Sequence, residues 1–226
     1  MDFDISPLFV SAKTVFLSTL IVFFLGISLA WFMNNKNYKL NIILDSLITL
    51  PMILPPTVVG FFLLLFFGKN SPLGNFLYSI GIKIIFSWFA TVIAAIVVSF
   101  PLMYKTTLAA FQQIDKTLLD VARTLGVSEL RIFLTIVLPL SWPSIVAGTV
   151  LSGARALGEF GATLMIAGNI PGKTQTIPLA IFFAVESGNM NIAFFWVLII
   201  FSFSLVTIFI SNYWSTKNKR RLEERK

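Results

Sequence analysis

The sequence contains neither cysteine nor histidine, and only 12% of its 226 residues are charged. The absence of thiols excludes a disulfide framework, and without Cys or His the usual ligands of zinc, haem and iron–sulfur centres are missing. Histidine-dependent catalysis is excluded as well. We therefore expect no catalytic residue, no metal site and no cofactor.

Apolar residues are what the chain has in excess. They make up 57% of it, Phe alone occurs 24 times, and the mean hydropathy is +0.88. Soluble domains carry roughly 25% charged residues, about twice the share in this chain. A soluble protein of this size could not bury so much apolar surface behind so few charges, so the composition predicts an integral membrane protein. We expect residues 1–226 to form one all-α transmembrane domain.

Four stretches are apolar and long enough to cross a hydrocarbon core about 30 Å thick, which takes about 20 helical residues. They are Thr14–Met33, Ile42–Phe67, Ile84–Met103 and Ile192–Ile210. A fifth, Trp142–Ala167, is apolar but contains Arg155 and Glu159. The first is too long for a signal peptide and follows acidic residues, so we expect it to stay in the mature protein. Another apolar segment, Thr176–Val185, is too short to span and is predicted to be re-entrant, interfacial or external. We expect about five spans, or six if that segment crosses.

The net charge of +7 comes from lysines and arginines concentrated in three segments. They are Lys36 and Lys39 after the first span, Lys105, Lys116, Arg123 and Arg131 between the third and fourth, and Lys217, Lys219, Arg220, Arg221, Arg225 and Lys226 in the tail. Because loops rich in Lys and Arg stay cytoplasmic, we expect the C-terminus inside and the N-terminus outside the cytoplasmic membrane. The basic tail, residues 215–226, then contacts anionic lipid rather than nucleic acid.

The segment 113–139, between the third and fourth spans, is too polar to span and too patterned to be disordered. Gln113–Leu125 is predicted to be a helix that ends at Gly126, because glycine readily adopts the left-handed conformation that closes helices. Its predicted apolar face holds Leu118, Ala122 and Leu125. Ser128 is expected to cap a second helix, which Pro139 ends unless it begins the next span. Two short helices joined at a glycine would form a compact cytoplasmic element, although an ordinary interhelical loop remains an alternative.

The spacing within this segment resembles the EAA loop of bacterial ABC importer permeases. The family pattern is Glu-Ala-Ala, three residues, Gly, nine residues, Ile, one residue and Leu-Pro. The matching positions here are Asp120, Val121, Ala122, Gly126, Ile136, Leu138 and Pro139. Asp120 replaces the family's Glu and Val121 its first Ala. The resemblance implies the type I importer permease fold and a loop that docks on a separate ATPase subunit, present in two copies.

Three further runs are similar to the molybdate and sulfate permease group. They are Leu54–Gly60, Gly153–Thr163 and Ala167–Ala180. This resemblance implies import of an oxyanion, with molybdate first, tungstate as a further substrate and sulfate or thiosulfate as the alternative. It also implies a second copy of the chain around a shared pore, an extracytoplasmic binding protein that delivers the anion, and ATP hydrolysis by the partner.

Arg155 and Glu159 are predicted to lie inside the fourth span, where a charge costs at least ~2.5–3.5 kcal/mol. Four residues apart on one helix, they can pair and offset part of that cost. They either lock this span into the bundle or line and gate the translocation path, where Arg155 would attract an oxyanion. Ser152 and Thr163 are candidate hydroxyl donors for the same path.

Prolines and small residues suggest where helices break and approach each other. Pro51, Pro55 and Pro56 lack a backbone donor and are expected to break or kink the second span. Broken helices are tolerated where they line a cavity, so Leu54–Gly60 is predicted to lie beside the path or its outer gate, unless it merely bends a peripheral helix. Small residues allow close approach within the subunit or to a second copy: Gly148, Ser152, Ala154, Gly158 and Ala162.

The run Gly168–Thr174 resembles a phosphate-binding loop, but only three residues separate its glycines where a P-loop needs four. We predict an external turn and no nucleotide site. Two other functional classes remain open. An ion-coupled secondary transporter would need intramembrane carboxylates and an inverted repeat, and no repeat is evident. A membrane-bound enzyme is disfavoured by the absence of His and Cys.

Overall fold

The computed structural model describes residues 4–34 and 38–223, and side chains within 4–34 and 42–209. These residues are helical, without a strand among them. The α-helices are α1 (Ser6–Asn34), α2 (Tyr38–Ile53), α3 (Pro56–Phe67), α4 (Pro72–Ser79), α5 (Trp88–Gln112), α6 (Lys116–Thr124), α7 (Glu129–Ile132), α8 (Leu138–Leu157), α9 (Gly161–Ala167), α10 (Ile177–Glu186) and α11 (Met190–Glu223). A π-helical turn, η1 (Phe133–Val137), joins α7 to α8. The predicted all-α class is confirmed.

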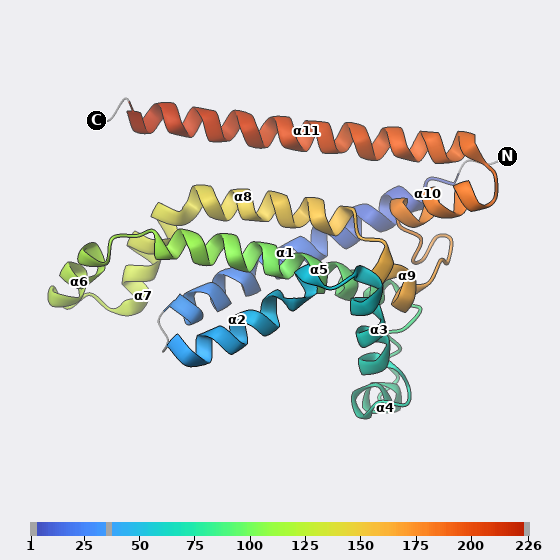
Figure 1. Ribbon diagram of the computed structural model, residues 1–226, viewed down its shortest axis with the longest axis horizontal. Helices are drawn as coiled ribbons and strands as arrows, with labels where there is room; N and C mark the ends of the chain where they lie inside the picture. Colours follow the sequence, from blue (N-terminus) through green and yellow to red (C-terminus); the bar gives the residue numbers. More distant parts are fainter. Residues whose placement is uncertain (1–3, 35–37, 224–226) are drawn as a thin grey trace.

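The long helices run side by side, with α6 and α7 at one end and α9 and α10 at the other (Figure 1). Within the described residues, four helices are long and apolar enough to cross a membrane: α1, α5, Glu129–Leu157, and Met190–Phe209 of α11. The fifth predicted span, Ile42–Phe67, is present as a helix pair, α2 and α3, bent by 115°. Each of the five predicted spans therefore has a helical counterpart.

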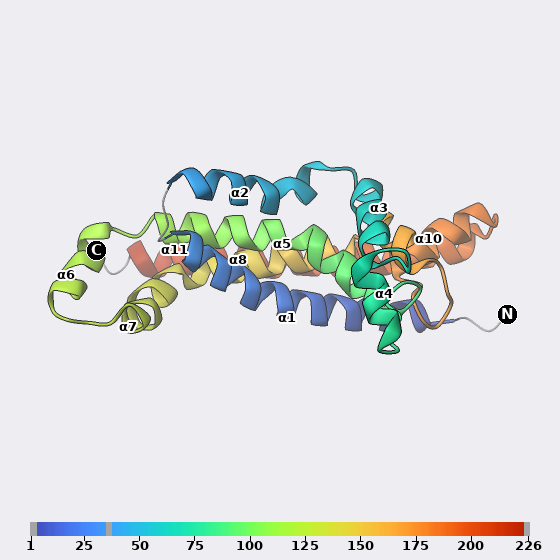
Figure 2. The same ribbon diagram turned by 90° about the horizontal axis from the view of Figure 1, so that it is seen from below.

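The bend between α2 and α3 comes from two consecutive prolines. Pro55 precedes α3 and Pro56 is its first residue, so two backbone N–H donors are missing where a continuous helix would need them. Pro51 remains inside α2. As a result α3 turns away from the direction of α2 and leads to α4 at the side of the bundle (Figures 1 and 2).

Helix α5 is the centre of the core and lies between α1 and α8. Two glycines allow the close packing. A Cβ on Gly26 of α1 would lie 2.7 Å from the Met103 side chain of α5, and one on Gly148 of α8 would lie 3.1 Å from Thr106. Gly148 thus serves packing within the subunit. Near the N-terminus of α5, the hydroxyls of Thr14 and Thr91 lie 2.9 Å apart and form a hydrogen bond between α1 and α5.

The short helix α10 lies at the α9 end, where the backbone N–H of Ile177 donates to the Ser11 hydroxyl of α1 (2.8 Å). From there α11 returns to the end that holds α6 and α7 (Figure 1). The described chain therefore starts at one end of the bundle, and α11 finishes at the end that holds α6 and α7, as five crossings require. Lys36 and residues 224–226 lie outside the described residues, as do the side chains of Lys39 and of the basic tail from residue 215.

Candidate functional site

The predicted two-helix element between the third and fourth spans is present. Helix α6 begins at Asp115, whose carboxylate accepts a hydrogen bond from the Thr117 N–H (2.9 Å) and therefore has a pKa below its usual range. It is shorter than Gln113–Leu125, and Gly126 follows with φ of 77°, the left-handed conformation predicted for it. Ser128 precedes α7, but its side chain makes no capping hydrogen bond.

The predicted apolar face of α6 is only partly buried. Leu119 and Ala122 are the residues of α6 that are buried, whereas Leu118 and Leu125 are exposed. The reason is that α6 carries apolar residues on two sides, of which the bundle covers one. Five apolar residues of this element are exposed, and together we call them the end patch: Leu118, Val121 and Leu125 of α6, Leu130 of α7 and Leu134 of η1. Exposed apolar patches of this kind mark interaction sites.

One arginine clamps the two short helices together. The guanidinium of Arg123 donates to Asp120 on its own helix (2.8 Å) and to Glu129 of α7 (2.7 Å). These hydrogen bonds from Arg123 to Glu129 and Asp120 raise the Arg123 pKa above its usual value, so the residue stays charged. The exposed Asp120 therefore belongs to a network that spans Gly126 and limits independent motion of α6 and α7.

Pro139 does not end the second helix, contrary to one of the two predicted outcomes. The helix continues from α7 through η1 into α8, where Pro139 lies in the first turn. In η1 the N–H of Leu138 bonds to the Phe133 carbonyl five residues earlier, which is the wider π-helical register. Ile136, Leu138 and Pro139 thus belong to one continuous helix that links the two-helix element to the fourth span.

The predicted single helix over Trp142–Ala167 is wrong, because the chain breaks between α8 and α9. Helix α8 ends at Leu157, with Gly158 as its C-cap, and Glu159 lies in the break. Arg155 and Glu159 nevertheless pair: Nη1 of Arg155 lies 3.0 Å from Oε2 of Glu159. The other carboxylate oxygen accepts a hydrogen bond from the Ala162 N–H (2.8 Å), in the first turn of α9. Glu159 gains this second partner because the helix restarts after it.

This ion pair is unequally exposed. The Glu159 side chain is 1% exposed, whereas that of Arg155 is 36% exposed. The carboxylate is therefore fixed in the protein by a cation and a backbone donor, which offsets its desolvation. The Arg155 side chain is partly exposed, so it remains accessible to another anion.

The break after α8 touches the break between α2 and α3. A Cβ on Gly161 would lie 3.0 Å from Pro56, and a Cβ on Gly60 would lie 2.8 Å from the Cα of Ala162. These glycines allow α3 and α9 to pack backbone against backbone. Pro55 and Pro56 remain exposed. The structure thus brings together Arg155, Glu159 and the proline break, three features that the sequence predicted separately.

The two predicted hydroxyl donors lie elsewhere. Ser152 is fully buried, and its hydroxyl donates to the Gly148 carbonyl of its own helix (2.7 Å). Thr163 of α9 is also buried, with 1% of its surface exposed. Both residues are therefore buried, whereas the Arg155 side chain is partly exposed.

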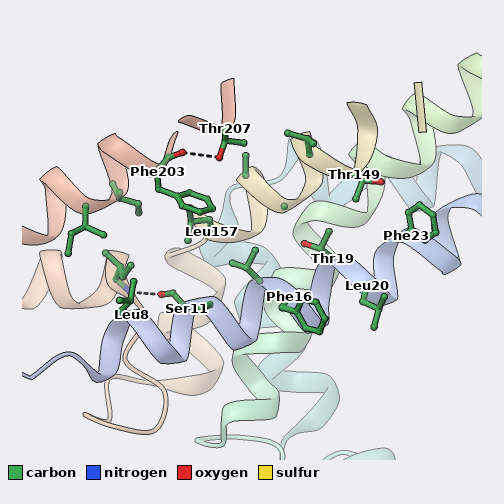
Figure 3. A pocket seen from close by; sticks show the side chains of 18 of the residues that line it. Leu8, Ser11, Phe16, Thr19, Leu20, Phe23, Thr149, Leu157, Phe203 and Thr207 are labelled. Atoms are coloured by element: carbon green, nitrogen blue, oxygen red, sulfur yellow. Dashed lines mark hydrogen bonds between the residues drawn. The ribbon is translucent and has the colours of Figure 1, made fainter. Parts of the chain in front are cut away.

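A cavity of about 690 Å³ opens between α1, α8, α10 and α11 (Figure 3). Its walls are almost entirely apolar, with Phe16, Phe23 and Phe203 among them, and none of its lining residues is charged. An oxyanion would lose its hydration there without a compensating charge, so this cavity is not a candidate site for one.

The run that resembles a P-loop folds as a closed turn after α9. The Thr174 hydroxyl accepts from the Ile170 N–H and donates to the Gly168 carbonyl, both at 3.0 Å. Gly168 and Gly172 have φ of 64° and 70°. The turn follows a helix rather than a strand, so it lacks the strand–loop–helix context of a phosphate-binding loop.

One charged cluster was missed by the sequence analysis. Nζ of Lys105 lies 2.6 Å from Oδ2 of Asp45, and the buried Tyr104 hydroxyl donates to Oδ1 of the same carboxylate (3.1 Å). The charge pattern predicts Lys105 in the loop after the third span, but it lies within α5, seven positions before Gln112. Asp45 could have indicated this cluster, because a carboxylate inside the apolar stretch Ile42–Phe67 needs a cationic partner.

The comparisons with known proteins agree with this architecture. A family described as "Binding-protein-dependent transport system inner membrane component" matches residues 22–220. The chain is 39% identical to the molybdenum transport system permease protein ModB of Escherichia coli K12, over 93% of each chain. The corresponding Haemophilus influenzae protein is 38% identical over 88% of this chain and 87% of its own length. A sulfate transport system permease protein, CysT of Salmonella typhimurium, is 32% identical over 87% of this chain and 71% of its own.

Solved structures resemble the fold at lower sequence identity. A bacterial ABC transporter involved in the import of alginate gives a TM-score of 0.74 at 19% identity, over 94% of this chain and 79% of that one. The inward-facing MetNI methionine ABC transporter gives 0.67 at 13% identity, over 92% and 94%. The predicted type I importer fold is confirmed.

Proposed function

The chain belongs to the family of binding-protein-dependent transport system inner membrane components, and from that premise we propose that it is the membrane-spanning subunit of an ATP-driven oxyanion importer. As a member of that family with apolar spanning helices, it is a multi-pass membrane protein. Molybdate is the proposed substrate, with tungstate as a further one. The higher identity to molybdenum permeases (39%) than to a sulfate permease (32%) supports this order.

The observation that carries the proposal is the end patch on α6 and α7. Its apolar residues are exposed: three lie on α6, beyond the spans, and Leu130 and Leu134 lie at the start of Glu129–Leu157. The element that carries them is linked across Gly126 by Arg123 and is continuous with α8. Such a surface suits a cleft on a soluble partner. We propose that this partner is the ATPase subunit, in two copies, and that the chain itself hydrolyses no ATP.

The proposed orientation follows from this assignment and from the basic segments. The α6–α7 end and the C-terminus face the cytoplasm, and the start of α1 faces outward. An extracytoplasmic binding protein would release the anion near α9 and α10. The translocation path then runs past the two breaks, where Arg155 and Glu159 line or gate it beside Pro55 and Pro56. A second copy of the chain completes the path, with Ser152 and Thr163 packed behind it in the conformation described.

Reconstitution tests the proposed function. The chain is co-expressed with its ATPase, purified as a complex, and inserted into vesicles with the binding protein and radiolabelled molybdate. We expect uptake that requires ATP and the ATPase, is suppressed by tungstate and is weakly suppressed by sulfate. Equal suppression by sulfate and molybdate would identify a sulfate permease instead. Uptake by the chain alone, driven by an ion gradient, would identify a secondary transporter.

A further inference from the structure

Two cations inside the spanning helices pair with carboxylates of broken spans. Lys105 of α5 pairs with Asp45 of α2 at 2.6 Å, and Arg155 of α8 pairs with Glu159 in the α8–α9 break at 3.0 Å. In each pair the cation is the more exposed partner, with side-chain exposures of 44% against 29% and 36% against 1%. Both cationic side chains are therefore partly exposed. Their carboxylates accept further hydrogen bonds, from the Tyr104 hydroxyl to Asp45 and from the Ala162 N–H to Glu159.

Both cations point away from α1. Met103 of α5 meets Gly26 of α1, and Gly153 of α8 faces Thr19 of α1. Lys105 and Arg155 each follow one of these residues by two positions, which is a rotation of about 200° in an α-helix. Because α5 and α8 pack side by side, the two cations lie on one common side of the pair. Figure 2 shows α2, which carries Asp45, on the side of α5 opposite to α1.

The two cations are also staggered along the bundle. Thr106, next to Lys105, lies beside Gly148 of α8. Arg155 is seven positions further along α8, and seven residues of α-helix rise by about 10 Å. Arg155 is near the α9 end and Lys105 is nearer the α6 end, so an anion that moves inward past Arg155 would next approach Lys105.

We infer that Lys105 is a second anion-binding residue on the translocation path and that Asp45 is its resident counter-ion. The inference rests on the proposed function, because it assigns a further residue to the path of the same oxyanion. A tetrahedral oxyanion such as molybdate carries two negative charges and binds Lys105 in exchange for Asp45. The return of Asp45 to Lys105 releases the anion toward the α6 end. A partly exposed ion pair contributes little to stability, whereas a charge within an apolar spanning helix is costly. Holding α2 against α5 is therefore a poor explanation for the Lys105–Asp45 pair.

The natural absence of cysteine provides a sharp test. Lys105→Cys introduces the only thiol of the chain, which is then modified in the complex with a cysteine-free ATPase. An aminoethyl methanethiosulfonate restores a cation at position 105, and a sulfonatoethyl reagent places an anion there. We expect Lys105→Cys to lower ATP-dependent molybdate uptake about fivefold, the cationic reagent to restore it and the anionic reagent to abolish it. Phe16→Cys, on the exposed side of α1, is the control that neither reagent should affect.

The decisive experiment repeats the modification with Asp45→Asn also present. If the pair only braces α2 against α5, a restored cation has no carboxylate to bind and uptake stays low. If Lys105 binds the anion, the cationic reagent raises uptake by Asp45→Asn/Lys105→Cys above that of the unmodified double variant. The uptake stays below the wild-type level, because the variant lacks the carboxylate that displaces the anion. Co-purification with the ATPase verifies that each variant is assembled. Absence of rescue in assembled complexes overturns the inference while wild-type uptake persists. Absence of molybdate uptake by the wild type overturns the proposed function, and this inference with it.

Discussion

Gly60 of α3 and Ala162 of α9 meet backbone to backbone, since a Cβ at position 60 would lie 2.8 Å from the Ala162 Cα and 2.7 Å from the Met165 side chain. This contact joins two helices that each follow a break in a spanning segment. The position of α9, and with it the carboxylate of Glu159 that caps α9, therefore depends on the absence of a side chain at position 60.

Gly60→Ala is expected to destabilise the subunit by about 1–3 kcal/mol, because overpacking forces backbone shifts in a well-packed region. Thermal unfolding of the purified complex measures the effect. Gly158→Ala is the matched control, since a Cβ there would lie 3.8 Å from the Ala154 carbonyl, an ordinary contact. Equal unfolding temperatures for both variants would contradict the close approach of α3 and α9.

The unequal exposure of the Arg155–Glu159 pair predicts unequal effects of removing either partner. Arg155→Gln leaves a buried carboxylate unpaired and should cost about 3–5 kcal/mol of stability. Glu159→Gln leaves the half-exposed guanidinium partly hydrated and keeps an acceptor for the Ala162 N–H, so a loss of about 1–2 kcal/mol is expected. Unfolding of the two variants in detergent gives the order, and the reverse order would show that Glu159 is not the buried partner.

The same pair should matter more for transport than for insertion. Arg155→Ala and Glu159→Ala are expected to reach the membrane in near-normal amounts, because the long apolar helices direct insertion, but to lower molybdate uptake at least tenfold. Membrane fractionation and vesicle uptake are measured on the same preparations. Normal uptake by correctly inserted variants would show that the pair has no part in the path.

The end patch predicts where the ATPase binds. Val121→Asp or Leu125→Glu places a charge in the proposed interface and should weaken ATPase binding at least tenfold, about 1.4 kcal/mol. Because both residues are more than half exposed, the fold of the subunit should tolerate the change. Lys116→Glu on the same helix, outside the patch, is the control. Co-purification at increasing salt separates the variants, and retained binding by Leu125→Glu would move the interface elsewhere.

Substitution of Arg123 tests whether transport needs the link between α6 and α7, in addition to the contact of the end patch with the ATPase. Arg123→Ala leaves the patch intact but leaves Asp120 and Glu129 as unpaired like charges. Exposed ion pairs contribute about 0–1 kcal/mol, so global stability should change little. ATP hydrolysis should then proceed with reduced uptake per ATP, measured as the ratio of the two rates. Arg131→Ala is the matched control, since Arg131 is exposed on α7 and makes no ion pair among the described contacts.

Much of the architecture was predictable, because the lengths of the apolar stretches and the positions of Lys and Arg are read directly from the sequence. The proline break, Gly126 and the start of α7 also follow from local residues. The break at Gly158 does not, because small residues are common inside membrane helices. It is evident only in the structure, where α8 ends at Leu157 and the Ala162 N–H of α9 donates to Glu159. The pairing of Asp45 with Lys105 joins positions 60 residues apart. Which apolar residues of α6 the bundle covers could not be predicted, because the helix carries apolar residues on two sides and Leu118 and Leu125 remain exposed among the described residues.

The uninterrupted helix from Glu129 to Leu157 has a mechanical consequence. Its 29 residues span about 43 Å, so a tilt of about 5° imposed at the α7 end would displace the Arg155 end by about 4 Å. Glu159 follows Arg155 by four residues, so the ion pair would move with the end of α8 relative to α3, against which α9 packs. A modest swing of a neighbour bound at the α7 end is therefore enough to shift both charges at the far end of the helix.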